Sequence, residues 1–174
     1  MGNARDQDEW FDVVDSHDRV IEQRRRHEVH RLGLQHRAVH IFVKRSDGKL
    51  LLQMRSQHKD TSPGKWTTSC SGHVDAGESY SQAALRELNE ELGMSGYALS
   101  ELSFLGQHAP CRETGQEFIH VYLLVSDTEP IPDPYEIDSV HWKTREEIDD
   151  MLRFQTDDFS PAFALVWGLA KPSL

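Results

Sequence analysis

The stretch that decides the fold of this chain is Gly72–Met94, which reads GHVDAGESYSQAALRELNEELGM. It opens with a loop that carries two glycines, Gly72 and Gly77, and continues into a segment with helical spacing that ends at Leu92. Gly93 follows the last helical residue, where a left-handed glycine commonly ends a helix without steric cost. The stretch therefore predicts a loop that leads directly into a helix.

Apolar and acidic side chains separate on this predicted helix. At about 100° per residue, the apolar and small residues fall on one arc, and the glutamates fall on a neighbouring arc. We expect the first arc to pack against a core and the second to display its carboxylates. The first arc holds Ser81, Ala84, Leu85, Leu88 and Leu92, and the second holds Glu87, Glu90 and Glu91.

The three glutamates are open to two interpretations, a solvated acidic helix face or a metal site. Like charges at these spacings repel by about a few tenths of a kcal/mol per pair, and the helix has no lysine to interleave them. The glycine-containing loop can also bring backbone carbonyls close to the carboxylates. Because clustered carboxylate and carbonyl oxygens suit hard divalent cations, the pattern favours an Mg²⁺ or Mn²⁺ site.

The spacing of these residues resembles a known motif. Gly72, then Glu78, then the run from Arg86 to Met94, which reads RELNEELGM, fill every defining position of the Nudix box. The resemblance implies a single Nudix domain over residues 1–174, with the box at 72–94 and an N-terminal strand extension at 1–35. It also implies an α/β/α sandwich built on a mixed β-sheet.

The same resemblance implies roles for individual residues. Glu90 and Glu91 would be metal ligands, Glu87 a ligand or the general base, and Arg86 the residue that orients Glu87. The family's metal-ligating carbonyl usually comes from a glycine, and Ser71 occupies that position here. Glu78 would be a more distant carboxylate of the box.

Composition narrows the class of partner. The chain has 174 residues, 37% of them hydrophobic, and a net charge of −10, with no basic block to neutralise nucleic-acid phosphates. It has no apolar run of membrane-spanning length, and its polar start is unlike a signal peptide. The two cysteines, Cys70 and Cys111, form no CxxC pattern, which favours a reducing, cytoplasmic setting.

The remaining elements follow from periodicity and turn residues. We expect residues 24–33 to form either a short helix or a loop, and Ser46-Asp47-Gly48 to join a hairpin. Helices are expected from the capping box at Thr144 to about Leu152, and from Ser160-Pro161 to Leu169. Strands are expected at Trp10–Val14, Val20–Gln23, Arg37–Lys44, Leu50–Arg55, Trp66–Cys70, Leu99–Gln107, Glu117–Val125 and Ser139–Lys143.

The flanks of the box are similar to one branch of the Nudix superfamily, the isopentenyl diphosphate isomerases. The similarity runs from about Trp10 to Trp142 and rests on the segments HRAVHIFVKRSDGKLLLQMRS and KDTSPGKWTTSCSGH. It implies that Arg55 and Lys59 hold a substrate diphosphate; the alternative for each is a solvated surface cation. His73 would contact phosphate or metal, or make a structural hydrogen bond.

Departures from the isomerase pattern bear on the reaction. The isomerase cysteine position holds Ser71, and Cys70 is displaced by one residue, which in a strand points it to the opposite face. Of a glutamate pair, Glu117 matches one position and Gly115 occupies the other. Among the isomerase's metal-binding histidines, His36 and His73 match, and His30 is offset by one residue.

A complete box with an incomplete isomerase set favours hydrolysis. We therefore expect a metal-dependent Nudix hydrolase that cleaves the diphosphate bond of a nucleoside diphosphate linked to another moiety, with Mg²⁺ or Mn²⁺ as cofactor. Glu87, Arg86 and Glu117 are the candidate catalytic residues. The alternatives are isopentenyl diphosphate isomerisation and a non-catalytic nucleotide-binding module. Because members of the family are often dimers, the resemblance is also compatible with a homodimer.

Overall fold

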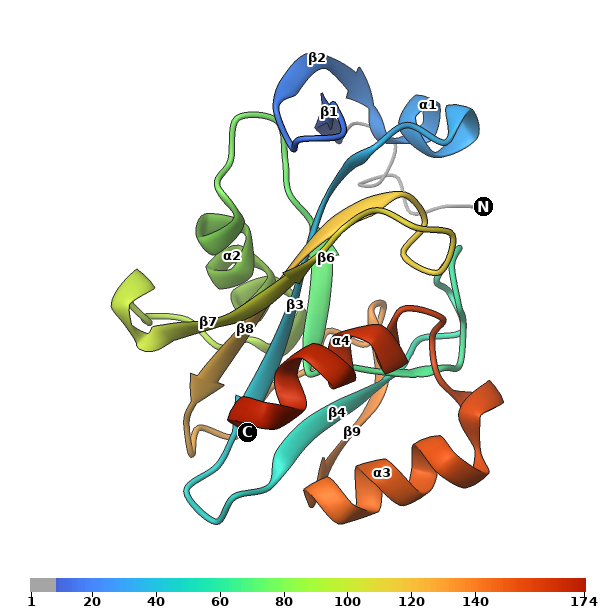
Figure 1. Cartoon of the computed structure of the whole chain (residues 1–174). Coiled ribbons are helices and arrows are strands. Elements are labelled where there is room, and N and C mark those ends of the chain that lie inside the picture. The colour runs from blue at the N-terminus through green and yellow to red at the C-terminus, as the bar shows by residue number, and fades with distance from the viewer. Residues whose placement is uncertain (1–8) are drawn as a thin grey trace.

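The computed structural model describes residues 9–174, and the start of the expected domain, residues 1–8, lies outside the described residues. A mixed β-sheet is covered by α2 (Tyr80–Leu92) on one face and by α3 (Arg145–Phe154) and α4 (Phe163–Ala170) on the other (Figure 1). This is the α/β/α sandwich expected from the box. The helices are α1 (Arg26–Leu32), α2 (Tyr80–Leu92), α3 (Arg145–Phe154) and α4 (Phe163–Ala170).

The large sheet has the path β5-β4-β3-β8-β7, with β6 paired to β3 and β9 paired to β4. Strands β3 and β8 run parallel, and the other pairs in this sheet run antiparallel. The strands are β3 (His36–Lys44), β4 (Leu50–Arg55), β5 (Trp66–Thr67), β6 (Cys70–His73), β7 (Leu102–His108), β8 (Glu117–Val125) and β9 (Ile137–Lys143).

Alternation along β3 divides the core into two layers. Val39 and Ile41 pack with the apolar side of α2, and Phe42, on the other face, packs with residues of α4. All of β3 pairs with β8, residues 38–41 also pair with β6, and side chains pack on both faces of the strand, so His36 and His40 are buried with it. The strand therefore carries two histidines into the interior on the α4 face.

The predicted hairpin between β3 and β4 forms only next to its turn. Lys44 pairs with Leu50 across the turn, and beyond this pair the two strands separate, because β3 pairs with β6 while β4 pairs with β5 and β9. Ser69, in the crossing from β5 to β6, connects the separated strands. Its hydroxyl donates to the Leu51 carbonyl at 2.6 Å and accepts from the Val43 N–H at 2.7 Å.

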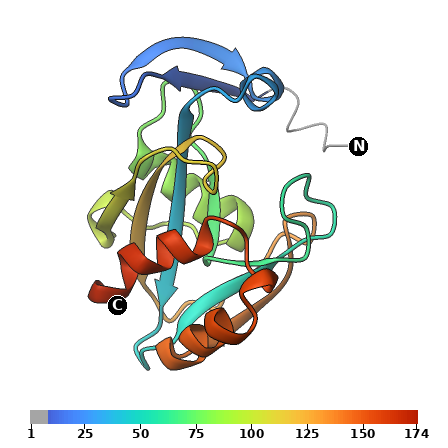
Figure 2. The ribbon, with the colours of Figure 1, turned by 45° about the vertical axis from the view of Figure 1, so that its right-hand side comes forward.

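An N-terminal hairpin lies beyond the end of the sheet at which β3 begins (Figures 1 and 2). It consists of β1 (Trp10–Val14) and β2 (Val20–Arg25), which pair with each other, and β1 also forms an isolated bridge from Phe11 to Asp75. The ambiguous segment that follows is helical: α1 ends at Gly33, whose φ of 60° is left-handed. The carboxylate of Asp12 in β1 accepts from the Gly77 N–H at 2.9 Å, which connects this extension to the box loop.

Helix boundaries agree with the capping signals except at the C-terminal helix. Helix α2 ends at left-handed Gly93, and Thr144 forms the expected capping box with Glu147. The expectation that Ser160-Pro161 caps α4 is wrong, since α4 begins at Phe163 and has no side-chain cap. The Ser160 hydroxyl instead donates to Thr67, and residues 161–162 form a turn.

Several strand predictions need adjustment at their ends, for example β2, which ends at Arg25, and β9, which begins at Ile137. Leu99–Glu101 form a short 3₁₀ turn, so β7 begins three residues later than expected, at Leu102. The extended segment from Trp66 to Cys70 is interrupted after Thr67, where the chain crosses from β4 to β3. None of the helices in residues 9–174 has the length and apolar character of a membrane span.

Candidate functional site

A cleft of about 760 Å³ opens between the separated halves of the sheet. Its walls come from β3, β6, α2, the segment 59–62 and the loop before β8. The three box glutamates, Arg55, Lys59, His73 and Glu117 all line it. The structure thus brings the predicted catalytic, metal-binding and substrate-binding residues to one cavity.

Arg86 is the hub of the box loop. Its Nε and Nη2 atoms donate to the two carboxylate oxygens of Glu78 at 3.1 and 2.9 Å, and Nη2 also donates to the His73 carbonyl at 2.8 Å. Its Nη1 atom donates to Glu87 at 2.7 Å and to Glu90 at 3.2 Å. Burial alone would lower the pKa of Arg86, but Glu78 and Glu87 outweigh it and raise that pKa. Arg86 therefore fixes both the loop and two carboxylates.

Gly72 is required for the approach of Glu87 to the loop. A Cβ at Gly72 would lie 2.0 Å from Oε1 of Glu87, a distance at which no side chain fits. The backbone of Gly72 is not left-handed, so the close approach, not an unusual φ, demands glycine here. The box glycine thus makes room for the carboxylate next to β6.

Glu87 and Glu91 are buried, which differs from the expected display of all three carboxylates. Their residues are only 8% and 4% exposed, because their side of α2 also packs against β6. Glu91 accepts from Nε2 of Gln53 at 2.9 Å and from the Ser71 N–H at 3.3 Å. Burial raises the pKa of both carboxyls, and the charge of Glu91 raises that of Glu87 further.

This arrangement fits a divalent cation. Two buried carboxylates that repel each other are stabilised by a positive charge between them, and carboxylates are ligands that Mg²⁺ and Mn²⁺ favour. Glu90 has a side chain that is 57% exposed, so it can reorient from Arg86 toward a cation. The backbone of Ser71 lies against Glu91, as the N–H contact shows, so the residue with the predicted carbonyl ligand adjoins the box carboxylates.

The two predicted diphosphate-binding cations differ in their partners. Arg55 donates to the carbonyl and hydroxyl oxygens of Thr61, and within residues 9–174 it has no carboxylate at ion-pair distance. Lys59 is ion-paired with Glu136, which also lines the cleft. The positive charge of Arg55 is therefore not neutralised by a described carboxylate. Lys59 must break its ion pair with Glu136 before it can bind a phosphate.

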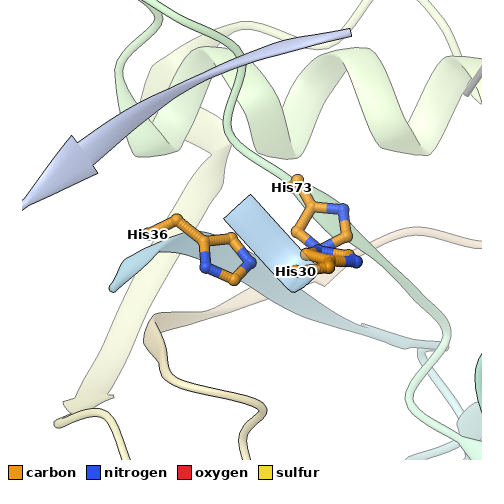
Figure 3. A group of neighbouring side chains, drawn as sticks. All are labelled: His30, His36 and His73. Atoms are coloured by element: carbon orange, nitrogen blue, oxygen red, sulfur yellow. The ribbon is translucent and has the colours of Figure 1, made fainter. Parts of the chain in front are cut away.

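A second group of ligating side chains lies at the N-terminal end of the cleft. Rings of His30, His36 and His73 point toward one another (Figure 3), with ligating atoms that all lie within 4.8 Å of one another. The offset of His30 in the sequence does not remove it from this group, because helix α1 and the turn at Gly33 carry its ring to the other two. Within residues 9–174, these three histidines are the one group of three or more potential metal ligands whose ligating atoms lie this close together.

Glu117 joins this histidine group. Its Oε1 atom lies 3.1 Å from Nε2 of His73 and 3.6 Å from Nε2 of His36. Burial alone would raise the pKa of Glu117, but the two histidines outweigh it and lower that pKa. In His36, Nδ1 faces the Leu34 carbonyl at 2.9 Å and must donate, so in the neutral ring Nε2 presents a lone pair to the group.

Nε2 of His36 is buried and has no hydrogen-bond partner in residues 9–174. A lone pair that faces a carboxylate is unfavourable unless a cation lies between them, so the group fits a metal ion as well. Burial also lowers the pKa of His73 to about 4, which keeps that ring neutral and able to ligate. The cleft therefore contains two candidate metal centres, one acidic and one histidine-rich.

The prediction that Cys70 and Ser71 point to opposite faces of the strand is confirmed. Cys70 is fully buried in the core beside α2, where burial raises the pKa of its thiol, while Ser71 lines the cleft. Neither described cysteine lines the cleft. Gly115 also lines it, with a left-handed φ of 67°, and brings no second acid beside Glu117.

Sequence reasoning missed three side chains of the cleft region. Gln53 holds Glu91, and Glu136 pairs with Lys59; nothing in their local sequence distinguishes them from ordinary strand and loop residues. His40 also lines the cleft and had a detectable signal. It lies four residues after His36 in a predicted strand, so period-two alternation places both on the same face.

Comparison with known proteins agrees with this geometry. The model of the NUDIX domain matches residues 34–163. The isopentenyl-diphosphate delta-isomerase of Serratia proteamaculans is 38% identical over 160 residues, which cover 91% of this chain and 89% of that protein. An uncharacterized Nudix hydrolase of Yersinia pestis is 37% identical over 154 residues, which cover 88% of this chain and 80% of that protein.

A solved structure shares the fold over nearly the whole chain. The DR0079 protein of Deinococcus radiodurans superposes with a TM-score of 0.77 and 30% sequence identity, covering 92% of this chain and 99% of that protein. The relatives thus include proteins named as isomerases and proteins named as hydrolases. The chain belongs to the Nudix domain family, as an enzyme of the pyrophosphohydrolase type.

Proposed function

We propose that the protein is a divalent-metal-dependent hydrolase that cleaves the diphosphate bond of a nucleoside diphosphate linked to another moiety. The observation that carries the proposal is the pair of buried carboxylates, Glu87 and Glu91, with Glu87 seated in the space left by Gly72. Glu87, Glu90, Glu91 and the Ser71 carbonyl would hold Mg²⁺ or Mn²⁺. Enzymes of this family generally use divalent metals.

The chemistry needs a neutralised diphosphate and an activated water. A bound divalent cation supplies both, by offsetting phosphate charge and lowering the pKa of water. If Glu87 is the general base and not a ligand, it would accept a proton from the attacking water, whose oxygen would form the new P–O bond while the bridging oxygen leaves with the second phosphate group. Arg86 orients Glu87 through the 2.7 Å hydrogen bond and keeps the acceptor oxygen fixed.

The remaining predicted residues bind and position. Arg55 donates to the diphosphate, and Lys59 adds a second cation when it exchanges Glu136 for phosphate. Glu117 acts through His73, with which it shares the 3.1 Å contact, and His73 lines the cleft where it can reach a phosphate oxygen. In this proposal Glu117 positions a substrate-binding histidine.

Phosphate release from a panel of nucleoside diphosphates, triphosphates and coenzymes, with Mg²⁺ and Mn²⁺, tests the proposal. We expect Glu90→Gln to lower kcat/KM by at least about 100-fold, because it removes a charged ligand from an exposed site where folding does not depend on it. Glu113→Gln is the matched control, since Glu113 is an exposed carboxylate of the same cleft. Full activity in Glu90→Gln would refute the metal-binding role.

The histidine group favours a second candidate function, isomerisation of isopentenyl diphosphate. His36 and His73 match two metal-binding histidines that the isomerase resemblance implies, and the offset His30 and Glu117 lie beside them. Against it, the only thiol near that loop, Cys70, lies in the core. Formation of dimethylallyl diphosphate from isopentenyl diphosphate would reverse our order, and tight binding without turnover of any compound would indicate a nucleotide-binding module.

We also propose a small-molecule partner in a reducing, cytoplasmic setting. The net charge of −10 and the absence of a basic block support a diphosphate substrate over nucleic acid. Cys70 and Cys111 are unpaired, as expected where thiols stay reduced. A homodimer remains the expectation drawn from the family, and sedimentation of the purified chain tests it.

A further inference from the structure

His40 lies in the cleft without an assigned role. It is 6% exposed and lines the cleft from β3, opposite Ser71 of β6 in the strand register. Its Nδ1 atom contacts Oγ1 of Thr68 at 3.0 Å, and no partner within residues 9–174 contacts its Nε2 atom. Nε2 of His40 is not among the buried atoms that lack a partner, so it is open to the solvent of the cleft and available to a ligand.

The surrounding hydrogen bonds determine which ring nitrogen carries the proton. The Thr68 hydroxyl has one hydrogen, which it donates to the Cys70 carbonyl at 3.1 Å. Both contacts of Thr68 are satisfied only if His40 donates from Nδ1. Nε2 then holds a lone pair that faces the cleft, and burial, which lowers the pKa of His40 to about 4, keeps the ring neutral.

A neighbouring hydroxyl offers the complementary group. Thr67, next to Thr68 in the chain, lines the same cleft and accepts a hydrogen bond from the Ser160 hydroxyl at 3.2 Å. Its own hydroxyl hydrogen has no acceptor in the part of the chain that the structure describes. His40 contacts Thr68, the chain neighbour of Thr67, and both His40 and Thr67 line the cleft, so the cleft offers the acceptor and the donor that a ligand hydroxyl needs.

We propose that His40 and Thr67 form a subsite for the hydroxyl-bearing group, such as a sugar, that is carried by the diphosphate. A hydrocarbon group over His40 would cover Nε2 and leave it unpaired, and a site built for a hydroxyl discriminates against such a group. No phenylalanine, tyrosine or tryptophan of residues 9–174 lines the cleft to cover an alkene or stack a base. The subsite rests on the proposed function and names its substrate class.

Two phosphate monoesters that differ only in the carried group provide the test. Ribose 5-phosphate and isopentenyl monophosphate are titrated into protein with ¹⁵N-labelled histidine, and the Nε2 resonance of His40 is followed. We expect an unprotonated Nε2 in the free protein, a shift with ribose 5-phosphate, and about tenfold tighter binding of that ester than of the isopentenyl ester. Equal binding, tighter binding of the isopentenyl ester, or no shift at Nε2 would overturn the subsite.

Three variants separate recognition from folding. His40→Phe keeps a ring of similar size and should abolish the tenfold preference, and His40→Gln, whose amide oxygen can accept a hydrogen bond, should restore part of it. Thr68→Val should weaken the preference and change the His40 tautomer, although Thr68 does not line the cleft. A preference that persists in His40→Phe contradicts the proposal.

The test is independent of turnover. If no diphosphate is hydrolysed but the ester preference depends on His40, the proposed function fails and the subsite stands. If metal-dependent hydrolysis is found and the preference is absent, the subsite alone fails.

Discussion

The carboxylate of Glu87 occupies the volume in which a side chain at Gly72 would begin, with Oε1 2.0 Å from the position of that Cβ. We expect Gly72→Ala to displace Glu87 and to destabilise the protein by about 1–3 kcal/mol, the usual cost of overpacking. Metal-dependent hydrolysis should fall by about 100-fold or more. Urea unfolding and phosphate release measure the two effects.

Removing the Glu87 side chain should relieve the Gly72→Ala defect. In the Glu87→Ala background, Gly72→Ala should cost less than about 0.5 kcal/mol, because the atoms with which it collides are gone. Gly168→Ala is a control, since Gly168 has no atom within 4 Å of an added Cβ and lacks a left-handed φ. A Gly72→Ala penalty that is equal in both backgrounds would show that Glu87 does not cause it.

The buried carboxylates predict a pH-dependent stability of the metal-free protein. Burial raises the pKa of Glu87 and Glu91 above the ordinary value of 4.5, so the folded state holds their protons more tightly than the unfolded state does. Their contribution to stability is therefore present below pH 4.5 and is lost as pH rises toward the raised values. At pH 8, Glu87→Gln should unfold at a higher temperature than wild type, with a free energy of unfolding about 1–3 kcal/mol larger. At pH 4 the two proteins should have the same stability.

Buried histidines oppose this trend, so the difference between wild type and Glu87→Gln is the quantity to measure. His40 and His73, whose pKa values burial lowers, add stability as pH rises toward 6.5 in both proteins and cancel in the difference. Saturating Mn²⁺ should stabilise wild type more than Glu87→Gln. A difference that does not change with pH would contradict the raised pKa of Glu87.

Arg86 cannot be replaced by lysine without loss. Its fork contacts Glu78, Glu87, Glu90 and the His73 carbonyl at once, and an ammonium cannot reproduce that planar geometry. We expect Arg86→Lys to lower kcat about 10- to 100-fold and stability by roughly 1–3 kcal/mol. Arg45→Lys, in an exposed pair with Glu129, serves as the control and should leave kcat unchanged.

The two candidate metal centres predict two bound ions per chain. Manganese titration followed by electron paramagnetic resonance should give two sites in wild type and one in Glu90→Gln. His36→Phe should also give one, since it removes the Nε2 lone pair while it keeps the ring that stacks on Phe11 at a 5.6 Å centroid distance. Two full sites in His36→Phe would show that this histidine is not a ligand.

Ser69 predicts how the separated strands are held together. Because its hydroxyl satisfies both the Val43 N–H and the Leu51 carbonyl, Ser69→Ala should leave two buried groups unpaired and cost about 2–4 kcal/mol. Ser103→Ala, on an exposed position of β7, should change stability by less than about 0.5 kcal/mol. Chemical denaturation compares them, and equal stability of the two variants would refute the bridging role.

Local patterns accounted for the box and most elements. The period of Gly72–Met94, its glycine stop and the capping box at Thr144 each act through neighbours in sequence, and the structure has them as expected. The error at Ser160 has a tertiary cause, since its hydroxyl bonds Thr67 instead of capping α4.

Contacts between distant segments were beyond local reasoning. The burial of Glu87 and Glu91 depends on how closely α2 approaches β6, and helical periodicity alone does not report that distance. The position of His30 depends on the path of α1 and the turn at Gly33. The turn between β3 and β4 was predicted, but its sequence does not indicate that β3 pairs with β6 instead of β4 beyond the turn.

The single residue pair between β3 and β4 assigns the two walls of the cleft to different parts of the chain. One wall, formed by β6 and α2, contains the residues of the Nudix box. The opposite wall includes cleft residues between Lys59 and Ser62, which follow β4 in the other half of the sheet. Insertions or substitutions in residues 56–65 can therefore alter which compound is accepted without moving Glu87, Glu90 or Glu91. Such a division lets one reaction be retained through divergence while its choice of substrate changes.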